Sequence, residues 1–164
     1  MAHRPHADAA ALARCAVVTV SDTRTVETDR SGQLIQSQLR SAGHAIVAYH
    51  LVKDEPDQIR ALVAQLSAAA DAIILSGGTG IAPRDTTYDA IAALLEKQLP
   101  GFGELFRQLS YAEIGSRAIA SRAAAGIYQS VLIFSLPGSS RAVQLAMEQL
   151  IVPELPHLVS QLRG

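Results

Sequence analysis

Residues 72–80 have the sequence Ala-Ile-Ile-Leu-Ser-Gly-Gly-Thr-Gly, an aliphatic run followed by three glycines within four residues. Two similar apolar runs, Ala-Val-Val-Thr-Val at 16–20 and Val-Leu-Ile-Phe at 131–134, also end at turn signals, and residues 44–52 form another candidate strand. Continuous apolar runs are typical of parallel strands that are covered on both faces. We therefore expect a mainly parallel sheet buried between helices.

The segments between these runs have the three- and four-residue spacing of amphipathic helices. The apolar positions are Leu34, Ile35 and Leu39 before the second strand, and Ile59, Leu62, Val63 and Leu66 before the third. Further helices are predicted over residues 87–97, 103–109, 111–125, 140–150 and 153–162, with a capping box of Ser110 and Glu113 opening the segment 111–125. The alternation of strands and helices predicts a three-layer α/β/α fold.

The length and composition fit one compact domain. The chain has 164 residues, of which 49% are apolar and 18% charged, and its formal net charge is -1. This length predicts a single domain, which we place at residues 14–164 after a frayed tail at 1–13. The charge balance argues against nucleic-acid binding, which normally needs a basic surplus. The apolar surplus indicates that another subunit covers part of the surface, so we expect a homo-oligomer.

The cysteine content and the N-terminal sequence predict a cytoplasmic protein. Cys15 is the single cysteine, so no internal disulfide is possible, and the histidines lack the spacing of a zinc site. The N-terminus lacks the apolar run of a signal peptide, and no stretch approaches the roughly 18 apolar residues of a membrane span. We expect a soluble protein with no membrane association.

Candidate functional residues follow the predicted strands, because ligands of open parallel sheets bind beyond the carboxyl ends of the strands. Ser21 and Asp22 follow the first strand, Asp54 follows the second, Gly77, Gly78, Thr79 and Gly80 follow the third, and Pro137, Gly138 and Ser139 follow the last. The three glycines exceed what a turn requires and bring N–H groups close to a ligand, so we favour an anion site at 77–80. Neither G-x-x-x-x-G-K-[ST] nor G-x-G-x-x-G is present. At 138–140, a second anion site and an ordinary turn with a serine N-cap both remain open.

Two aspartates, Asp54 and Asp85, follow different strands and can therefore converge on one crevice. A pair of carboxylates there can bind a divalent cation or handle a proton. The alternative is helix capping, because Asp54 precedes Pro56 and Asp85 precedes the helix expected near Thr87. The residue pattern by itself favours capping.

Other charged residues have two interpretations each. Candidates for neutralising a phosphate are Arg84, Arg107, Arg117 and Arg122. Arg107 also has the three-residue helical spacing for an ion pair with Glu104. Asp22 and Asp29 flank the polar segment 23–31, where turn-forming aspartates of a solvated loop are the default expectation.

Taken together, the motifs resemble those of the MoaB/MogA family of molybdenum cofactor biosynthesis proteins. They are Thr-Val-Ser-Asp at 19–22, Asp-Arg-Ser-Gly at 29–32, Ala-Gly-His at 42–44, Gly-Gly-Thr-Gly at 77–80, Arg-Asp-Thr-Thr at 84–87, Pro-Gly-Phe-Gly-Glu at 100–104 and Leu-Pro-Gly-Ser at 136–139. The segment from Phe102 to Gly115 is more similar to the MoaB branch. The resemblance implies a Rossmann-like sheet in the molybdopterin-binding, MogA-like fold. The chain departs from the family at Tyr88, where a proline is usual, which predicts a changed helix start without loss of the site.

The resemblance also implies a function, namely molybdopterin binding and adenylylation with Mg-ATP, which gives adenylyl-molybdopterin and pyrophosphate. The family's essential aspartates match Asp54 and Asp85, the implied catalytic residues and Mg²⁺ ligands. The implied substrate-binding residues are Ser21, Asp22, Gly77, Gly78, Thr79, Gly80, Pro137, Gly138 and Ser139. A homo-oligomer, as a trimer or hexamer, and contacts with other proteins of molybdenum cofactor biosynthesis are further implications. The alternatives are a non-catalytic molybdopterin-binding protein for storage or delivery, and a scaffold without substrate.

Overall fold

The sheet has the parallel core that the apolar runs predict. The computed structural model describes residues 11–164, and within them six strands form one sheet in the order β2-β1-β3-β6-β5-β4. The strands are β1 (Arg14–Val20), β2 (Ala45–Val52), β3 (Ala72–Ser76), β4 (Lys97–Gln98), β5 (Ala124–Tyr128) and β6 (Val131–Leu136). Strands β2, β1, β3 and β6 are parallel, and β5 runs antiparallel to both of its neighbours. The expected α/β class is confirmed, and the antiparallel edge is an addition to the predicted sheet.

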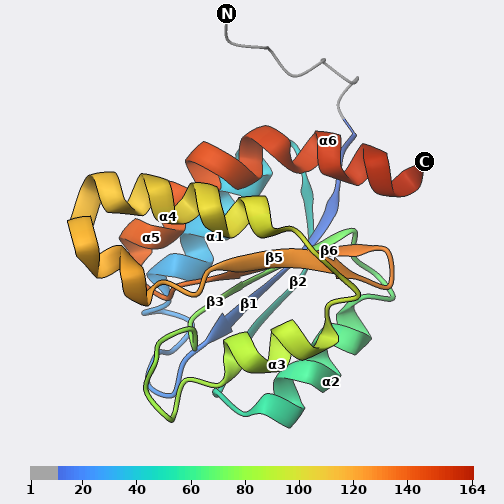
Figure 1. The fold of residues 1–164 in the computed structure, drawn as a ribbon. Helices are drawn as coiled ribbons and strands as arrows, with labels where there is room; N and C mark the ends of the chain where they lie inside the picture. Colours follow the sequence, from blue (N-terminus) through green and yellow to red (C-terminus); the bar gives the residue numbers. More distant parts are fainter. Residues whose placement is uncertain (1–10) are drawn as a thin grey trace, which may run out of the picture.

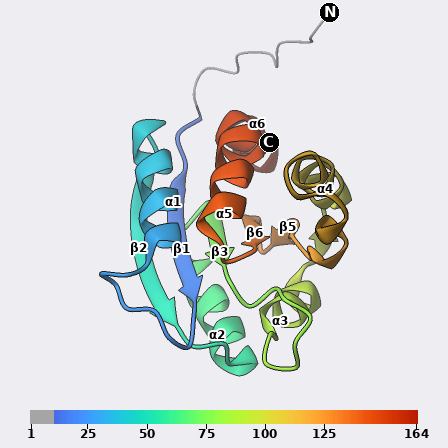
Figure 2. The ribbon, with the colours of Figure 1, turned by 90° about the vertical axis from the view of Figure 1, so that its left-hand side faces the viewer.

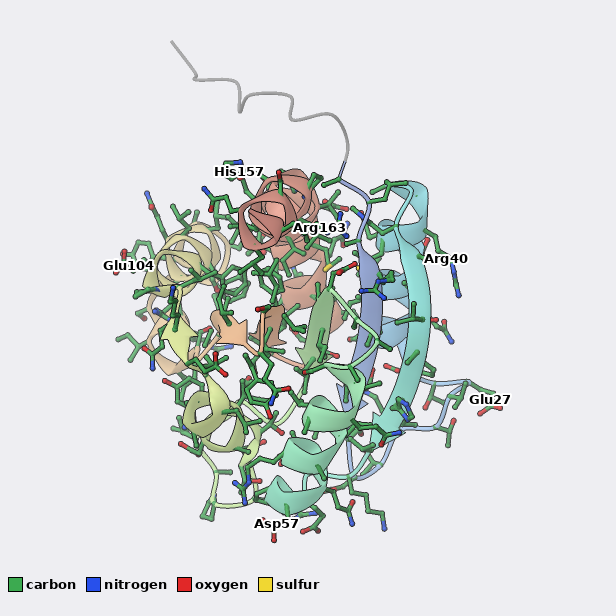
Figure 3. The ribbon with its side chains drawn as sticks, turned by 90° about the vertical axis from the view of Figure 1, so that its right-hand side faces the viewer. Glu27, Arg40, Asp57, Glu104, His157 and Arg163 are labelled. Carbon is green, nitrogen blue, oxygen red and sulfur yellow. The ribbon has the colours of Figure 1, made fainter. Side chains whose placement is uncertain are left out.

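Helices cover both faces of this sheet, as Figure 1 shows. They are α1 (Arg30–Ser41), α2 (Pro56–Leu66), α3 (Thr87–Leu94), α4 (Pro100–Ile114), the 3₁₀ helix η1 (Gly115–Ala120), α5 (Ser140–Ala146), the π-helical turn η2 (Met147–Ile151) and α6 (Val152–Arg163). Helices α1, α4, α5 and α6 lie on one face and α2 and α3 on the other, so Glu104 on α4 and Asp57 on α2 lie on opposite sides (Figure 3). Ile133 and Phe134 are consecutive on β6 and belong to two different apolar cores. Each face of the sheet therefore has a core of its own, which confirms the three-layer prediction.

The predicted helix over residues 111–125 is correct only in part, because 111–114 belong to the end of α4, 115–120 form the 3₁₀ helix η1, and 124–125 begin β5. Helix α4 continues through the buried Ser110 without a cap there and ends before Gly115, whose φ is 67°. Strand β5 follows and joins β6 through Gln129 and Ser130, whose φ values are 47° and 62°. A two-residue loop with positive φ at both positions is a type I′ hairpin turn, which Asn or Gly usually signals. The sequence Gln129-Ser130 contains neither residue, so the hairpin could not be predicted from its turn.

Two other helix boundaries differ from the prediction. Helix α3 ends at Leu94, and Lys97, expected as the last residue of that helix, forms β4 together with Gln98. The two helices expected at 140–150 and 153–162 are a continuous helical stretch in which the π-helical turn joins α5 to α6. Pro153 has no N–H to donate to the carbonyl group four residues earlier, and the wider turn lies directly before it.

The predicted tail at 1–13 is tested only in its last residues, because residues 1–10 lie outside the described part of the chain. Ala13 is buried and donates its N–H to Nδ1 of His44 over 3.0 Å. The domain therefore includes Ala13 in addition to residues 14–164. Across the described residues, none of the helices is both long enough and apolar enough to cross a membrane.

The strand order has a topological switch point between β1 and β3. The chain goes from β1 to β2 on one side and then returns past β1 to β3 on the other side. Open parallel sheets bind ligands at such a switch point, beyond the carboxyl ends of the strands. Figure 2 shows the loops after β1 and β3 at this lower edge of the sheet. The topology thus brings the predicted site residues to one edge.

Candidate functional site

The loop after β3 contains glycines that no other residue can replace without strain. Gly77 and Gly78 have φ values of 99° and 69°, in the region that disfavours side chains. A Cβ on Gly77 would lie 2.1 Å from the carbonyl oxygen of Val20, and a Cβ on Gly78 would lie 2.1 Å from Oγ1 of Thr87. The glycines therefore allow the loop to pack directly against the end of β1 and the start of α3.

The peptide groups of this loop face in a consistent direction. The carbonyl of Gly78 accepts the N–H of Thr87, and the carbonyls of Thr79 and Gly80 accept hydrogen bonds from Arg122. The N–H groups of Gly78, Thr79 and Gly80 have no acceptor within residues 11–164. Successive N–H groups without an internal acceptor form an anion-binding concavity. The geometry thus agrees with the anion site predicted from the glycines.

The loop after β6 lies directly beside the glycine loop. A Cβ on Gly138 would be 3.2 Å from the Cα atom of Gly77. Ser139 is the N-cap of α5, and its Oγ accepts the N–H of Ala142 over 3.2 Å. The capping alternative for this serine is therefore confirmed. Since the start of α5 also borders the glycine loop, its N-terminal dipole adds positive potential next to the same place.

A cavity of about 440 Å³ joins these two loops to α4 and η1. Its lining contains Gly77, Gly78, Thr79, Gly80, Asp85, Pro137, Gly138 and Ser139 from the predicted site, and Phe106, Ser110, Ile114, Arg117, Ala120, Ser121 and Ala142 in addition. Sequence reasoning did not find the contributions of Phe106, Ser110 and Ile114, because an apolar helix face has the same pattern whether it borders a cavity or the core. Arg117 is exposed, and its guanidinium group has no hydrogen bond or ion pair within the described residues. It is an available cation at the wall of the cavity.

Asp54 is buried, with 5% of its surface exposed, and it caps a helix other than its own. The N-cap of α2 is Glu55, so the expected capping of α2 by Asp54 is wrong. Its Oδ1 accepts the hydroxyl groups of Thr86 (2.8 Å) and Thr87 (3.0 Å), and its Oδ2 accepts the N–H of Thr86 (3.2 Å). Asp54 therefore holds the beginning of α3 against the end of β2.

Asp85 has a different environment on the same loop. A Cβ on Gly80 would lie 2.7 Å from its Oδ2, so this carboxylate lies against the glycine loop, and it lines the cavity. The N-cap of α3 is Thr86, so the expected capping by Asp85 is wrong as well. No hydrogen bond to the carboxylate of Asp85 is present within residues 11–164. Asp85 is thus free to contact a ligand or a cation.

Ser21 and Asp22 do not line this cavity and have structural contacts instead. Ser21 Oγ accepts the N–H groups of Thr23 and Arg24. Asp22 accepts two hydrogen bonds from Arg84, over 2.8 and 3.0 Å, and these bonds lower the pKa of its carboxyl group. Arg84 also contacts Glu55 over 3.1 Å. These residues join the loops after β1, β2 and β3, so they border the site without facing the cavity.

Two predictions about other charged groups change with the structure. Arg107 donates to the carbonyls of Ser121 and Ala123, and the expected pair with Glu104 is absent among the described residues. Asp29 is fully buried as the N-cap of α1, where its side chain accepts the N–H of Gly32 and the hydroxyl of Tyr49. The expectation of a solvated turn residue at Asp29 is therefore wrong.

The structure offers few ligands for a metal ion. Within residues 11–164 no group of three or more His, Cys, Asp or Glu side chains is placed to hold one. Asp85 supplies a carboxylate without a protein partner, and Asp54 supplies Oδ2, which accepts only the N–H of Thr86. Asp85 lines the cavity and Asp54 does not, so this pair provides one carboxylate there for Mg²⁺, which often takes one or two carboxylates together with substrate phosphates and water.

Comparison with known proteins agrees with this geometry. Residues 16–157 match the family described as a probable molybdopterin-binding domain. Molybdenum cofactor biosynthesis protein B of Bacillus subtilis is 57% identical over 155 residues, which are 93% of this chain and 91% of that protein. A crystal structure of a molybdenum cofactor biosynthesis protein B, 48% identical, has a TM-score of 0.90 and covers 94% of this chain and 98% of its own. The tungsten cofactor synthesizing protein MoaB of Pyrococcus furiosus is 36% identical with a TM-score of 0.84, over 94% of this chain and 99% of its own.

Proposed function

Because the chain belongs to the family of molybdopterin-binding domains that includes the MoaB and MogA proteins, we propose that it binds molybdopterin and adenylylates it with Mg-ATP. In this reaction an oxygen of the terminal phosphate of molybdopterin attacks the α-phosphorus of ATP. The bond between the α-phosphorus and the oxygen that bridges to the β-phosphate breaks, and the products are adenylyl-molybdopterin and pyrophosphate. Phosphoryl-group chemistry of this kind depends mainly on positioning and on stabilisation of negative charge.

One observation carries the proposal, namely the direction of the peptide groups in the loop at 77–80. Its carbonyl groups are occupied by Thr87 and Arg122, while the N–H groups of Gly78, Thr79 and Gly80 have no internal acceptor. In the proposed complex these N–H groups bind the terminal phosphate of the pterin. The net charge of -1 does not oppose this, since backbone dipoles provide the positive field locally.

The remaining residues of the cavity support the same orientation. The start of α5 and the free guanidinium group of Arg117 add positive potential. Phe106 and Ile114 provide apolar wall beside them, which suits a flat heterocyclic ring. We place the phosphate at the glycine loop and the pterin ring toward α4.

Asp85 and Asp54 have complementary roles in the proposal. Asp85, with its free carboxylate, is the residue that would hold Mg²⁺, and Oδ2 of Asp54 is the second candidate ligand. When bound, Mg²⁺ neutralises charge on the phosphate oxygens of ATP. Asp54 also holds Thr86 and Thr87 in place, and Thr86 is the next residue after Asp85. Asp54 thereby sets the position from which Asp85 contacts the nucleotide.

The proposal is tested with the purified chain, molybdopterin, ATP and Mg²⁺, by measuring adenylylated pterin and pyrophosphate. We expect turnover by the wild type and loss of turnover in Asp85→Asn. Asp57→Asn is the matched control, because Asp57 is an exposed first-turn aspartate of the neighbouring helix α2. Intact pterin binding without any turnover by the wild type would refute the adenylylation and leave a binding protein for storage or delivery.

The quaternary structure is a second part of the proposal. Tyr111 and Ile114, one turn apart on α4, are 64% and 48% exposed, and Ile119 in η1 is 87% exposed. Exposed apolar side chains of this size commonly mark subunit contacts. We expect a trimer or hexamer of this chain that covers Tyr111 and Ile119, and Ile119→Asp should shift it toward the monomer in light scattering. A wild-type monomer at micromolar concentration would contradict this.

A further inference from the structure

Arg122 lies behind the glycine loop and binds the backbone at several points. Its Nε donates to the carbonyl of Thr79 over 3.1 Å, and one terminal nitrogen donates to the carbonyls of Gly80 (2.6 Å) and Asp85 (3.4 Å). Its other terminal nitrogen contacts the carboxylate of Asp89 over 3.3 Å. A single guanidinium group therefore connects the loop at 77–80, the residue that precedes the N-cap of α3, and the first turn of that helix.

The position of the guanidinium group is itself held by an aromatic ring. The Arg122 guanidinium carbon lies 4.6 Å from the centre of the Tyr88 ring, which is a cation–π contact. Tyr88 and Asp89 are consecutive residues on α3, so one helical turn provides both the platform and the counter-charge. The side chain has no freedom to leave the loop without losing both contacts.

These contacts determine which way the loop presents the N–H of Gly80. A peptide group is planar, so a carbonyl turned toward Arg122 turns the following N–H away from it. The Thr79 carbonyl bound by Arg122 shares its peptide with the N–H of Gly80, which is one of the N–H groups of the proposed phosphate site. The Gly80 carbonyl shares its peptide with the N–H of Ile81, the next residue of the loop. A lysine cannot replace this fork, since one ammonium group cannot reach the same separated acceptors in a fixed plane.

We propose that Arg122 is a positioning residue that fixes the phosphate-binding loop, with Tyr88 as its platform. It acts from behind the loop, through the backbone, and it determines how strongly the site prefers a phosphorylated ligand. The inference about ligands rests on the proposed function, because it takes the pterin phosphate as the anion that the loop binds. The inference about the loop itself needs no ligand.

The experiment compares wild type, Arg122→Lys and Arg122→Gln with two ligands, molybdopterin and its phosphatase-treated form. We expect both variants to bind molybdopterin about 10-fold to 100-fold more weakly, as for loss of charge-assisted hydrogen bonds, while the dephosphorylated ligand changes less than about threefold. Tyr88→Phe should retain the wild-type preference, and Tyr88→Leu should lose part of it. Equal weakening for both ligands would indicate a general structural defect and would overturn the inference.

A second measurement separates this inference from the proposed function. Hydrogen exchange of the ligand-free protein should be several-fold faster over residues 77–86 in Arg122→Gln than in the wild type, at the hydrogen-bonded amides of Gly77, Asp85 and Thr86. Arg14→Gln is the matched control, because Arg14 also has several hydrogen bonds but lies at the opposite end of β1, against Asp71. Unchanged exchange over 77–86 in Arg122→Gln would overturn the role of Arg122. Failure of the wild type to bind molybdopterin, with faster exchange in the variant, would overturn only the ligand.

Discussion

Gly78→Ala should destabilise the protein by more than the backbone strain at this position alone. Gly78 has a φ of 69°, where an alanine costs about 1–2 kcal/mol. The added methyl group would lie 2.1 Å from Oγ1 of Thr87 and 2.6 Å from Oδ2 of Asp54. Those two side chains are buried and joined by a hydrogen bond of 3.0 Å, so neither can move aside without breaking it.

The expected magnitude follows from these two contributions. Loss of a hydrogen bond to a charged group costs about 1.5–3 kcal/mol. Together with the backbone strain, the free energy of unfolding should fall by about 3–5 kcal/mol. With a denaturant slope of about 2 kcal/mol per molar urea, the unfolding midpoint should decrease by roughly 2 M.

The assay is urea unfolding, followed by circular dichroism at one protein concentration. Gly43→Ala is the matched control, because Gly43 has a φ of 91° and a Cβ there would meet only Cδ2 of Leu12 at 3.3 Å. We expect about 1–2 kcal/mol for this control, from backbone strain alone. Equal losses in the two variants would show that the contact between Gly78, Thr87 and Asp54 contributes nothing.

Three further predictions concern single side chains. Asp85→Asn should lower the rate of adenylylation about 100-fold or more and leave the unfolding free energy unchanged within about 0.5 kcal/mol, whereas Asp54→Asn should lower the rate and also reduce the unfolding free energy by about 1–3 kcal/mol. Initial rates and urea melts distinguish the two variants, and a large loss of stability in Asp85→Asn would contradict the free carboxylate. Burial lowers the pKa of His44 from its ordinary 6.5, so the contribution of His44 to stability is complete above pH 6.5 and decreases as the pH falls below it. His44→Gln should remove this part of the pH dependence of the unfolding free energy in urea melts, and an identical pH dependence in the variant would refute the assignment. Burial raises the pKa of Cys15 to about 12, so at pH 8 a disulfide reagent should react only as fast as the protein unfolds, and rapid labelling of the native protein would count against this.

The sheet was predictable because its strands have a local signature. β1, β3 and β6 are buried on both faces and consist of continuous aliphatic residues, and each ends at residues that form turns. β5 has no comparable signature, since its alanines and Gly126 also fit a helix end and its hairpin turn uses Gln129 and Ser130. The strands with local signals were identified, and the two that depend on their neighbours, β4 and β5, were missed.

Loop residues that line the candidate site were predictable from the sequence, but the partners of its charged side chains were not. The glycines of the loop, Asp85 and the residues after β6 were expected at one edge of the sheet, and they line one cavity. The partners of Asp54 were not predictable, because Thr86 and Thr87 are 32 and 33 positions away in the sequence. Arg122 was noted only as a possible phosphate ligand, and its actual contacts lie 33 to 43 positions away.

Local sequence signals were thus sufficient to predict the α/β architecture and a glycine loop at the carboxyl end of a parallel strand. The periodicity of apolar residues and the conformational freedom of glycine are local properties, so they can be recognised without knowledge of the fold. Three roles became visible only in the folded molecule: Asp54 binds the start of α3, Asp85 has no hydrogen bond to its carboxylate within residues 11–164, and Arg122 holds the loop from behind. Those roles depend on hydrogen bonds between residues far apart in the chain, and packing alone determines which donors and acceptors meet.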